Sequence, residues 1–421
     1  MTYKQILIVA AGSMLALAQP PGARLSYRVV DLGPVGNAPG SPYFIANRGS
    51  VAGAVETGGT VHAVVWSGRQ VIDLGGLGGP NSQAFGVNNR GEVVGEAQSF
   101  ETNGEDFCGF NAFGLVPSAN ACKAFLWQNG AVTELSNTLG GVNAVANQIN
   151  NSGDVVGFAE TNQPKEAGCA VGRFAPVIWR NGSMRALATY SGDPDGAGFA
   201  INENGQAVGT TGRCAPFNVN SQLSLLESHA TLWNAHGSVY LIPGFGGDGG
   251  FAGNHACGIN NLGQVVGHSD EIDDKSFTGF FWSKDTGTAR LYPFAGDFAS
   301  LAIGINDRGQ VVGASLDADF VPRAMLWPDG AENNGMGIDL NTLVPEDSPL
   351  YLLGAFSINA KGEIAGFGVT NDGNLHGFLA TPNNGEDNQQ MRSSTKGRAI
   401  PVALSGNARR LLFQRFGIRK R

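Results

Sequence analysis

The chain has 421 residues, of which 63 are glycine, 42% are hydrophobic and only 15% are charged. This glycine content, without a Gly-X-Y period and beside so large an apolar fraction, excludes a collagen-like or disordered chain and favours an all-β protein with many turns. The net charge is −8, and the body is more acidic still because residues 383–421 hold nine Lys and Arg against two Asp and Glu. An acidic body argues against nucleic acid as a partner of the fold.

The first residues have the pattern of a secretory signal peptide. One lysine precedes an apolar run from Ile6 to Ala18, and Ala16-Leu17-Ala18 is a small-x-small triplet, which predicts a signal peptide of residues 1–18 cleaved after Ala18. The run is too short to span a bilayer, which takes about 20 residues. We therefore expect a secreted protein, extracellular or at the cell surface, with the periplasm as the alternative and no transmembrane segment in the mature chain.

A phrase of the form I-N-x-x-G-x-V-V-G recurs seven times between residues 45 and 368, as in VNNRGEVVGEA (87–97) and INNLGQVVGHS (259–269). Asn followed three residues later by Gly is typical of a type I turn whose glycine takes a positive φ as a G1 bulge. Each phrase therefore predicts a tight β-hairpin, with turn glycines such as Gly91 and Gly263. The second glycine, such as Gly95 or Gly267, falls inside the outgoing strand, where glycine is unfavourable unless something packs closely over its backbone.

Two further strands follow each hairpin. The third is apolar and ends in tryptophan in six units, including Trp127 and Trp327, and we expect these side chains to pack in the core or between repeats. Four short strands per unit describe the blade of a β-propeller. The seventh unit lacks a fourth strand, and an unmatched strand, YRVVDLG (27–33), precedes the first. The prediction is a seven-bladed β-propeller of four-stranded antiparallel blades over residues 25–382, closed by the N-terminal strand; an open β-solenoid is the alternative.

The fixed succession of three motifs resembles the HAF-repeat family of predicted extracellular bacterial proteins. The motifs are D-L-G-x-L-G-G, best kept in VIDLGGLGG (71–79), then the hairpin phrase, then segments such as HAVVW (62–66). The resemblance covers roughly residues 27–382, although the tripeptide His-Ala-Phe itself does not occur in this chain. It implies export and a propeller-like fold, and it brings no activity or catalytic residues with it.

Five cysteines in an exported chain predict two disulfides and one spare thiol. Cys108 and Cys122 flank one long insertion, so we expect them to pair. Cys169 and Cys214 lie in equivalent insertions of consecutive repeats and form the second expected pair. Cys257 is then a buried thiol, although five cysteines allow many other pairings.

The connections from the second to the third strand, and from the fourth to the next first strand, vary in length and emerge on one face of the propeller. Binding residues concentrate on loops held by a rigid scaffold, so we place the functional face there. Its candidate ligand-binding residues are Asp193, Asp195, Asp248, Asp270 and Asp273. Such carboxylates could hold Ca²⁺ or act as acid and base on a glycoside. Solvated loops on an acidic protein are the alternative, because Asn204 replaces the glutamate that a calcium loop starting at Asp193 needs, and no cofactor is assigned.

Three histidines, His62, His229 and His376, share one repeat position in the third strand, where other copies have Lys123 and Arg323. Ring symmetry spreads this position around the propeller, so we expect a structural hydrogen bond within each blade and not a metal site. His236, His255 and His268 are scattered with respect to the repeat. The sequence contains no catalytic-triad order, nucleophile elbow or phosphate loop.

These features predict a monomeric, exported binding or adhesion module without catalysis, whose ligand is an extracellular polysaccharide or a surface protein. A polysaccharide-active hydrolase or lyase that uses the loop carboxylates is the first alternative. A structural component of an envelope or matrix is the second. The basic C-terminal segment 383–421 then serves either as an attachment to an anionic surface or as a flexible solubilising tail.

Overall fold

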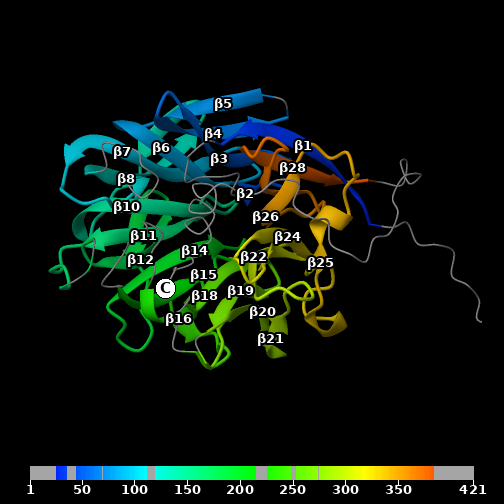
Figure 1. Ribbon diagram of the computed structural model, residues 1–421. Helices are drawn as coiled ribbons and strands as arrows, with labels where there is room; N and C mark the ends of the chain where they lie inside the picture. The colour runs from blue at the N-terminus through cyan, green and yellow to red at the C-terminus, as the bar shows by residue number, and fades with distance from the viewer. Residues whose placement is uncertain are drawn as a thin grey trace, which may run out of the picture.

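The protein is built almost entirely of β-strands. A computed structural model describes residues 25–35, 44–68, 70–110, 119–167, 169, 171–214, 225–247, 253–273 and 275–383. Within these ranges 28 strands form seven four-stranded antiparallel sheets, and no helix is long and apolar enough to cross a membrane. The predicted seven-bladed β-propeller is therefore confirmed (Figure 1). The expected signal peptide 1–18, and all of the expected tail 383–421 except Asn383, lie outside the described residues.

Each blade is one sheet of four strands, numbered here in chain order. The strands of blades 1 to 4 are β2 (Phe44–Ile45), β3 (Val51–Thr57), β4 (Thr60–Ser67), β5 (Gln70–Gly75); β6 (Gly78–Val87), β7 (Val93–Thr102), β8 (Asn120–Gln128), β9 (Ala131–Glu134); β10 (Gly140–Ile149), β11 (Val155–Thr161), β12 (Phe174–Arg180), β13 (Ser183–Ala186); β14 (Asp195–Ile201), β15 (Ala207–Cys214), β16 (Leu225–Trp233) and β17 (Val239–Leu241). Those of blades 5 to 7 are β18 (His255–Ile259), β19 (Val265–Asp270), β20 (Phe277–Ser283), β21 (Gly287–Leu291); β22 (Ala299–Ile305), β23 (Val311–Leu316), β24 (Pro322–Trp327), β25 (Ile338–Asp339); β26 (Tyr351–Ile358), β27 (Ile364–Val369), β28 (Leu375–Pro382) and β1 (Tyr27–Pro34). Two short 3₁₀ helices, η2 (Asn333–Gly335) and η3 (Leu340–Thr342), flank β25.

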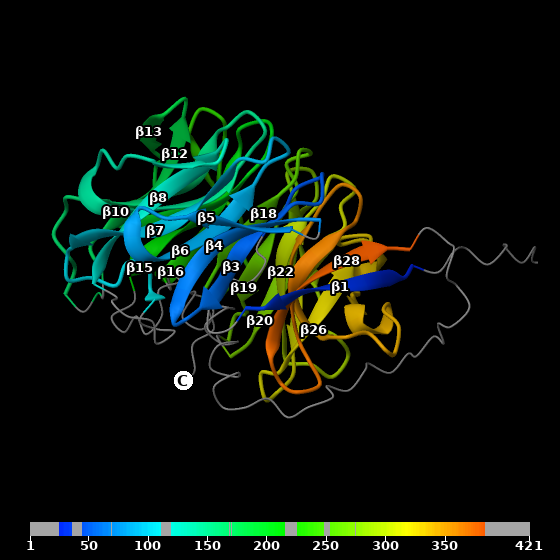
Figure 2. The same ribbon diagram turned by 90° about the horizontal axis from the view of Figure 1, so that it is seen from above.

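The first strand of each hairpin phrase is the innermost strand of its blade. Each of these strands, from β2 and β6 round to β26, contacts the first strands of both neighbouring blades, so together they surround the axis of the ring. The ring is closed as expected, because β1 pairs antiparallel with β28, from Tyr27 opposite Pro382 to Pro34 opposite His376. Figures 1 and 2 show the two strands side by side, β1 in blue against β28 in orange.

The turn between the first two strands has the geometry expected from the phrase. In blade 2 the backbone N–H of Gly91 donates to the carbonyl of Asn88 at 3.1 Å, and the N–H of Asn88 donates to the carbonyl of Glu92 at 3.0 Å. Gly91 has a φ of 81°, in the left-handed region that favours glycine. The six other turn glycines also have a positive φ: Gly49, Gly153, Gly205, Gly263, Gly309 and Gly362.

The turn asparagine also has a role that the turn alone did not predict. Its Oδ1 accepts from backbone N–H groups of its own turn, as Asn260 Oδ1 does from Leu262 and Gln264. Its Nδ2 donates to the backbone carbonyl at the same position of the next blade, as Asn260 does to Asn306 at 3.0 Å. Six such bonds of 2.9–3.1 Å run round the ring, from Asn88, Asn150, Asn202, Asn260, Asn306 and Asn359.

A second ring of hydrogen bonds lies one residue further along each turn. Its backbone N–H groups donate to side-chain oxygens of the adjacent turn, as Asn89 does to Asn151 at 2.8 Å. Between blades 1 and 2 the first ring is interrupted because Ala46 has no amide side chain, and here Asn47 donates to Asn89 in the second ring at 2.8 Å. Between blades 6 and 7 the described second ring is interrupted at Ala360, and the first ring bridges that junction. We call the two sets together the asparagine clamp.

The strand glycines fit against a bulge of the innermost strand. In six blades the pairing register of the first two strands shifts there, as between Ala84 and Gly86. A Cβ on Gly95 would collide with the carbonyl of Gln83, and the same collision occurs at Gly157, Gly209, Gly267, Gly313 and Gly366. The packing need shared by these six blades is thus a backbone carbonyl pointed at the second strand.

The tryptophans join neighbouring blades. Trp179, Trp233 and Trp327 are almost wholly buried. The indole N–H of Trp327 donates to the carbonyl of Tyr292, which follows the last strand of the preceding blade, at 3.2 Å. Trp66, Trp179 and Trp233 make the same kind of bond, whereas Trp127 packs half-buried against the cluster between blades 1 and 2. A buried indole needs such an acceptor, so each of these bonds also fixes the distance between two blades.

The predicted disulfide between Cys108 and Cys122 is present and links the β7–β8 connection to β8. Cys169 is also disulfide-bonded. Its expected partner, Cys214, ends β15, and the Cys214 side chain lies outside the described residues. Cys257 is a free thiol.

Replacing Asn260 by alanine tests the asparagine clamp. The substitution removes one bond to the next blade and leaves the N–H groups of Leu262 and Gln264 without their acceptor. We expect it to lower the free energy of unfolding by about 2–3 kcal/mol in urea denaturation. Leu262→Ala, at the exposed tip of the same turn, is the matched control and should change it by less than about 0.5 kcal/mol. Equal effects of the two variants would contradict the clamp.

Replacing Gly313 by alanine tests the bulge contact. Its new Cβ would meet the Leu301 carbonyl, which is backbone and cannot move aside as a flexible side chain would. We expect a loss of about 3 kcal/mol or more in the same measurement. Gly76→Ala is the control, because a Cβ there lies 3.7 Å from its nearest neighbour, Ser82 Cβ, in ordinary contact. Its effect should stay within about 1 kcal/mol, and a Gly313 variant as stable as the control would refute the packing argument.

Candidate functional site

The described acidic residues that were expected to bind a ligand each accept hydrogen bonds from groups of the protein itself. Asp193 accepts from the Thr211 hydroxyl at 2.6 Å and lies 2.9 Å from His229 Nδ1. Asp195 and Asp270 are buried in β14 and β19, where each accepts from a backbone N–H, Asp195 at 3.1 Å and Asp270 at 3.4 Å. Asp273 is exposed and accepts from a backbone N–H of its own turn at 3.1 Å. Asp248 lies outside the described residues.

The repeat position shared by His62, His229 and His376 faces a carboxylate in each blade where it is polar. The three Nδ1 atoms lie 2.9–3.0 Å from Asp73, Asp193 and Asp31 respectively. At the equivalent position Lys123 pairs with Glu101 at 2.8 Å, and Arg323 pairs with Asp297 at 2.8 Å. The third strand is not innermost, so these groups are spread round the ring and serve the blades, as expected from the symmetry.

A cavity of 410 Å³ lies on the axis of the propeller. Its mouth is formed by the turns between the first and second strands, including Asn47, Asn151, Glu203 and Asp307. It therefore opens on the face opposite to the long connections where the sequence placed the functional face. Its volume is in the range of small-molecule sites, about 300–1,000 Å³.

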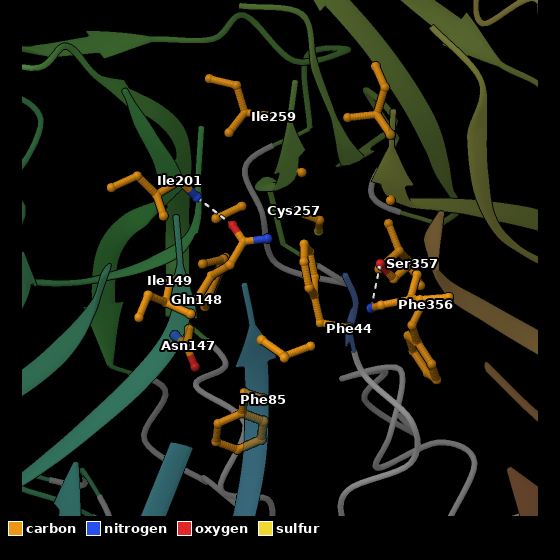
Figure 3. Close-up of a pocket in the computed structure, with 18 of the residues that line it drawn as sticks. Phe44, Phe85, Asn147, Gln148, Ile149, Ile201, Cys257, Ile259, Phe356 and Ser357 are labelled. Atoms are coloured by element: carbon orange, nitrogen blue, oxygen red, sulfur yellow. Dashed lines mark hydrogen bonds between the residues drawn. The ribbon is translucent and has the colours of Figure 1, made fainter. Parts of the chain in front are cut away.

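In each of the six blades with a described bulge, one side chain of the innermost strand enters this cavity. The bulged residue has no partner in the β-ladder, and its side chain turns to the axis. Figure 3 shows Phe85, Asn147, Cys257 and Phe356 around the cavity. The described members of this ring are Phe85, Asn147, Phe199, Cys257, Ile303 and Phe356, and Phe44 lines the cavity beside them.

Two hydrogen bonds hold the polar wall of the cavity in place. The amide oxygen of Gln148 accepts from the backbone N–H of Ile201 in the next blade at 2.5 Å. Ser357 Oγ accepts from the N–H of Ile45 at 3.2 Å, across the junction of blades 7 and 1 (Figure 3). Both bonds cross from one innermost strand to the next, so the wall is braced in the same way as the mouth.

The floor of the cavity comes from the insertion between β7 and β8. Phe107 and Cys108 line the cavity and are each 4% exposed. The Phe107 ring packs against the rings of Phe158 and Phe174, with centroid distances of 5.6 Å and 6.4 Å respectively. The Cys108–Cys122 disulfide fastens this segment to β8. The insertion thus contributes the end wall of an axial site.

Glu96 lies deep in the cavity, in β7, and is 3% exposed. Gln83 Nε2 of the adjacent strand donates to Glu96 Oε1. Burial raises the pKa of Glu96 to about 8, against the downward effect of the Gln83 bond, and the Asp106 carboxylate adds to the rise. At neutral pH this carboxyl group therefore holds its proton in most molecules.

His255 and His268 are brought together although the sequence left them scattered. They face each other across β18 and β19, with ring centroids 5.0 Å apart, and both line the cavity. Cys257 Sγ lies 3.8 Å from His268 Nδ1, and burial raises the pKa of this thiol to about 12. A thiol with so high a pKa is not a nucleophile at neutral pH.

Among the described residues, one group of three metal-ligand types clusters within 4.8 Å: Glu96, Cys108 and Cys122. Its two sulfurs are joined to each other in a disulfide, so neither is the thiolate that a metal needs. The group does not fit a metal ion.

Sequence analysis missed the cavity residues because the innermost strand was not known. Once it is known, every member of the ring can be found three residues before the turn asparagine, as Phe199 precedes Asn202 and Cys257 precedes Asn260. Glu96 and His268 share another position, directly after the strand glycine.

No family model and no curated protein sequence matches this chain. Among solved structures, a chain from YCF48 bound to D1 peptide is similar with a TM-score of 0.46 and 12% identity, over 88% of this chain and 99% of that one. The β-propeller domain of the Trilobed protease from Pyrococcus furiosus gives 0.44 and 11%, over 72% and 81%. The acylaminoacyl peptidase of Pyrococcus horikoshii gives 0.42 and 13%, over 69% of this chain but only 44% of that one. The likeness concerns the fold alone.

The raised pKa of Glu96 predicts that stability falls as the pH rises. The folded protein keeps this proton up to about pH 8, whereas the unfolded chain loses it near pH 4.5. The stability that this bound proton contributes is therefore fully present below pH 4.5 and is lost as the pH rises from there to about 8. We expect Glu96→Gln to unfold at the same urea concentration as wild type at pH 4 and to be more stable at pH 9, by up to about 5 kcal/mol.

Glu101→Gln is the control for that comparison. Glu101 lies in the same strand but is exposed and paired with Lys123, which lowers its pKa. Its replacement should not stabilise the protein at pH 9. A Glu96→Gln variant whose stability differs from wild type by the same amount at pH 4 and pH 9 would contradict the assigned pKa.

Proposed function

We propose that this protein is an exported, non-catalytic β-propeller binding module that takes its extracellular ligand into the axial cavity. One observation carries the proposal: each described bulge of the innermost strands places its side chain into one cavity that opens to solvent. A largely apolar wall with a few placed polar groups is the usual composition of a ligand site. Export, as in the HAF-repeat family that the sequence resembles, is part of the same proposal.

The geometry favours binding over hydrolysis. A glycosidase needs two carboxyl groups on opposite sides of the scissile bond, about 5–10 Å apart. Of the described residues that line the cavity, Glu96 is the only carboxyl group below the mouth. On the loop face, Asp193 and Asp270 accept hydrogen bonds within their own blades, and Asp195 accepts one from the backbone N–H of Phe174 in the preceding blade. This arrangement supports a binding module better than a hydrolase or lyase.

The sequence suggests a polysaccharide or a surface protein as the source of the ligand. A cavity of this volume admits one terminal group of such a partner, a sugar unit or a side chain, and not the whole polymer. The braced mouth stays open without a conformational change, which lowers the entropy lost on binding. Attachment through the basic tail would be compatible with this role.

Filling the cavity tests the proposal. Cys257→Phe places at one bulge the residue that three other blades already have there, Phe85, Phe199 and Phe356, so the repeat accommodates it. We would measure binding of soluble polysaccharides, monosaccharides, aromatic alcohols and aromatic amines by calorimetry and affinity electrophoresis. The sugars would then be sized by chromatography. A ligand of the wild type should bind at least tenfold more weakly to the variant and be recovered intact.

Asp273→Asn, on the exposed loop face, is the matched control and should leave binding unchanged. Thermal unfolding of both variants shows whether the fold is kept. Equal binding to wild type and Cys257→Phe would move the site away from the axis, and shortened sugar chains would replace the binding module by an enzyme.

A further inference from the structure

When Glu96 is ionised, two acceptor oxygens in the depth of the cavity lack a hydrogen-bond donor within the described part of the chain. Gln83 Oε1 is buried and has no partner there. Glu96 Oε2 lies 3.3 Å from Cys122 Sγ, and this sulfur is part of a disulfide, so it carries no hydrogen to donate. Both residues are 3% exposed, line the cavity and are joined through Gln83 Nε2 and Glu96 Oε1. Buried acceptors without donors are costly, so the pair calls for a ligand that brings N–H or O–H groups.

The charge of the cavity narrows the choice of donor. The described lining includes the carboxylates of Glu96, Glu203 and Asp307 but no Lys or Arg. Neither β6, which pairs with β7, nor β10 of the next blade, which packs against β7, carries a titratable side chain. From β8, Lys123 is paired with Glu101 at 2.8 Å. No fixed cation of the described wall therefore balances Glu96, whereas a positively charged ligand would.

The remaining wall suits an apolar body. Phe44, Phe85, Phe199 and Phe356 line the cavity between its mouth and Glu96. The face of a phenyl ring attracts a cation and also packs against aromatic or aliphatic carbon. A ligand with one charged end and one apolar end would meet both parts of the wall.

We propose that the axial cavity binds a small protonated amine with an apolar body, whose ammonium group donates to Glu96 Oε2 and Gln83 Oε1. This inference rests on the proposed function, because it names the chemical class of ligand for the same cavity. The phenyl rings hold the carbon skeleton, and the floor at Phe107 limits its length.

The amine must bind to the ionised form of Glu96, which gives the inference a pH signature. Its pKa of about 8 means that the carboxyl group must lose a proton below that pH, so affinity should rise about tenfold from pH 6 to pH 7. An amine stays protonated over this range. The other titratable groups that line the cavity are Glu203 and Asp307 at its mouth and His255, Cys257 and His268 from β18 and β19. The Asp106 carboxylate acts on Glu96 electrostatically.

Calorimetric titration with three probes of the same shape class tests the inference: benzylamine, its neutral counterpart benzyl alcohol, and benzyltrimethylammonium, which has the charge but no N–H. We expect benzylamine to bind and the other two to bind at least tenfold more weakly. Glu96→Gln should lower benzylamine affinity at least tenfold and remove its pH dependence. Glu101→Gln, an exposed glutamate of the same strand, is the matched control and should change neither.

The outcomes separate this inference from the proposed function. If benzyl alcohol binds as tightly as benzylamine, or Glu96→Gln has no effect, the amine inference is wrong. If no amine binds while a neutral ligand binds and is lost in Cys257→Phe, the binding module stands and the amine inference again falls. If benzylamine binds wild type and Cys257→Phe alike, the cavity is not the site and both proposals fail.

Discussion

The backbone carbonyl that each innermost strand points at its neighbour is the contact on which the rest of the molecule depends. It excludes any Cβ from the facing position of the second strand, so Gly157 and Gly313 are glycines for the same steric reason. The same bulge leaves one residue unpaired and turns its side chain toward the axis. A local backbone irregularity, repeated in register, thereby separates the positions that build the scaffold from the positions that face a ligand.

The asparagine clamp keeps this arrangement closed at the mouth of the cavity. The ring is closed by hydrogen bonds, because β1 completes the last blade by pairing with β28. Two concentric sets of turn bonds join the blades, and each set covers a junction that the other leaves out, at Ala46 and at Ala360. The mouth is therefore held by bonds that need no ligand. A rim that is already ordered loses little entropy when a ligand enters.

The seven blades, the order of strands and the closing strand could be predicted because repetition averages out the uncertainty of any single strand. The turn from Asn260 to Gly263 could also be predicted, because a turn depends on the residue types at a few consecutive positions. The bond from the Asn260 side chain to the carbonyl of Asn306 in the next blade could not be predicted, because it depends on how the blades are placed side by side. The cavity could not be predicted either, because period-two patterning tells which side chains share a face but not which strand lies nearest the axis.

Ring symmetry alone would leave a ligand without a preferred orientation, and the residue after each strand glycine removes that degeneracy. Blade 2 has Glu96 at this position and blade 5 has His268, whereas the other copies are Ala54, Phe158, Thr210, Ala314 and Phe367. The scaffold positions are thus nearly identical in all blades while the axial positions differ in charge, size and hydrogen-bonding capacity. Glu96 is the only carboxyl group among the seven copies, so it gives the cavity one acidic end, and a molecule with one cationic end can then bind in only one direction.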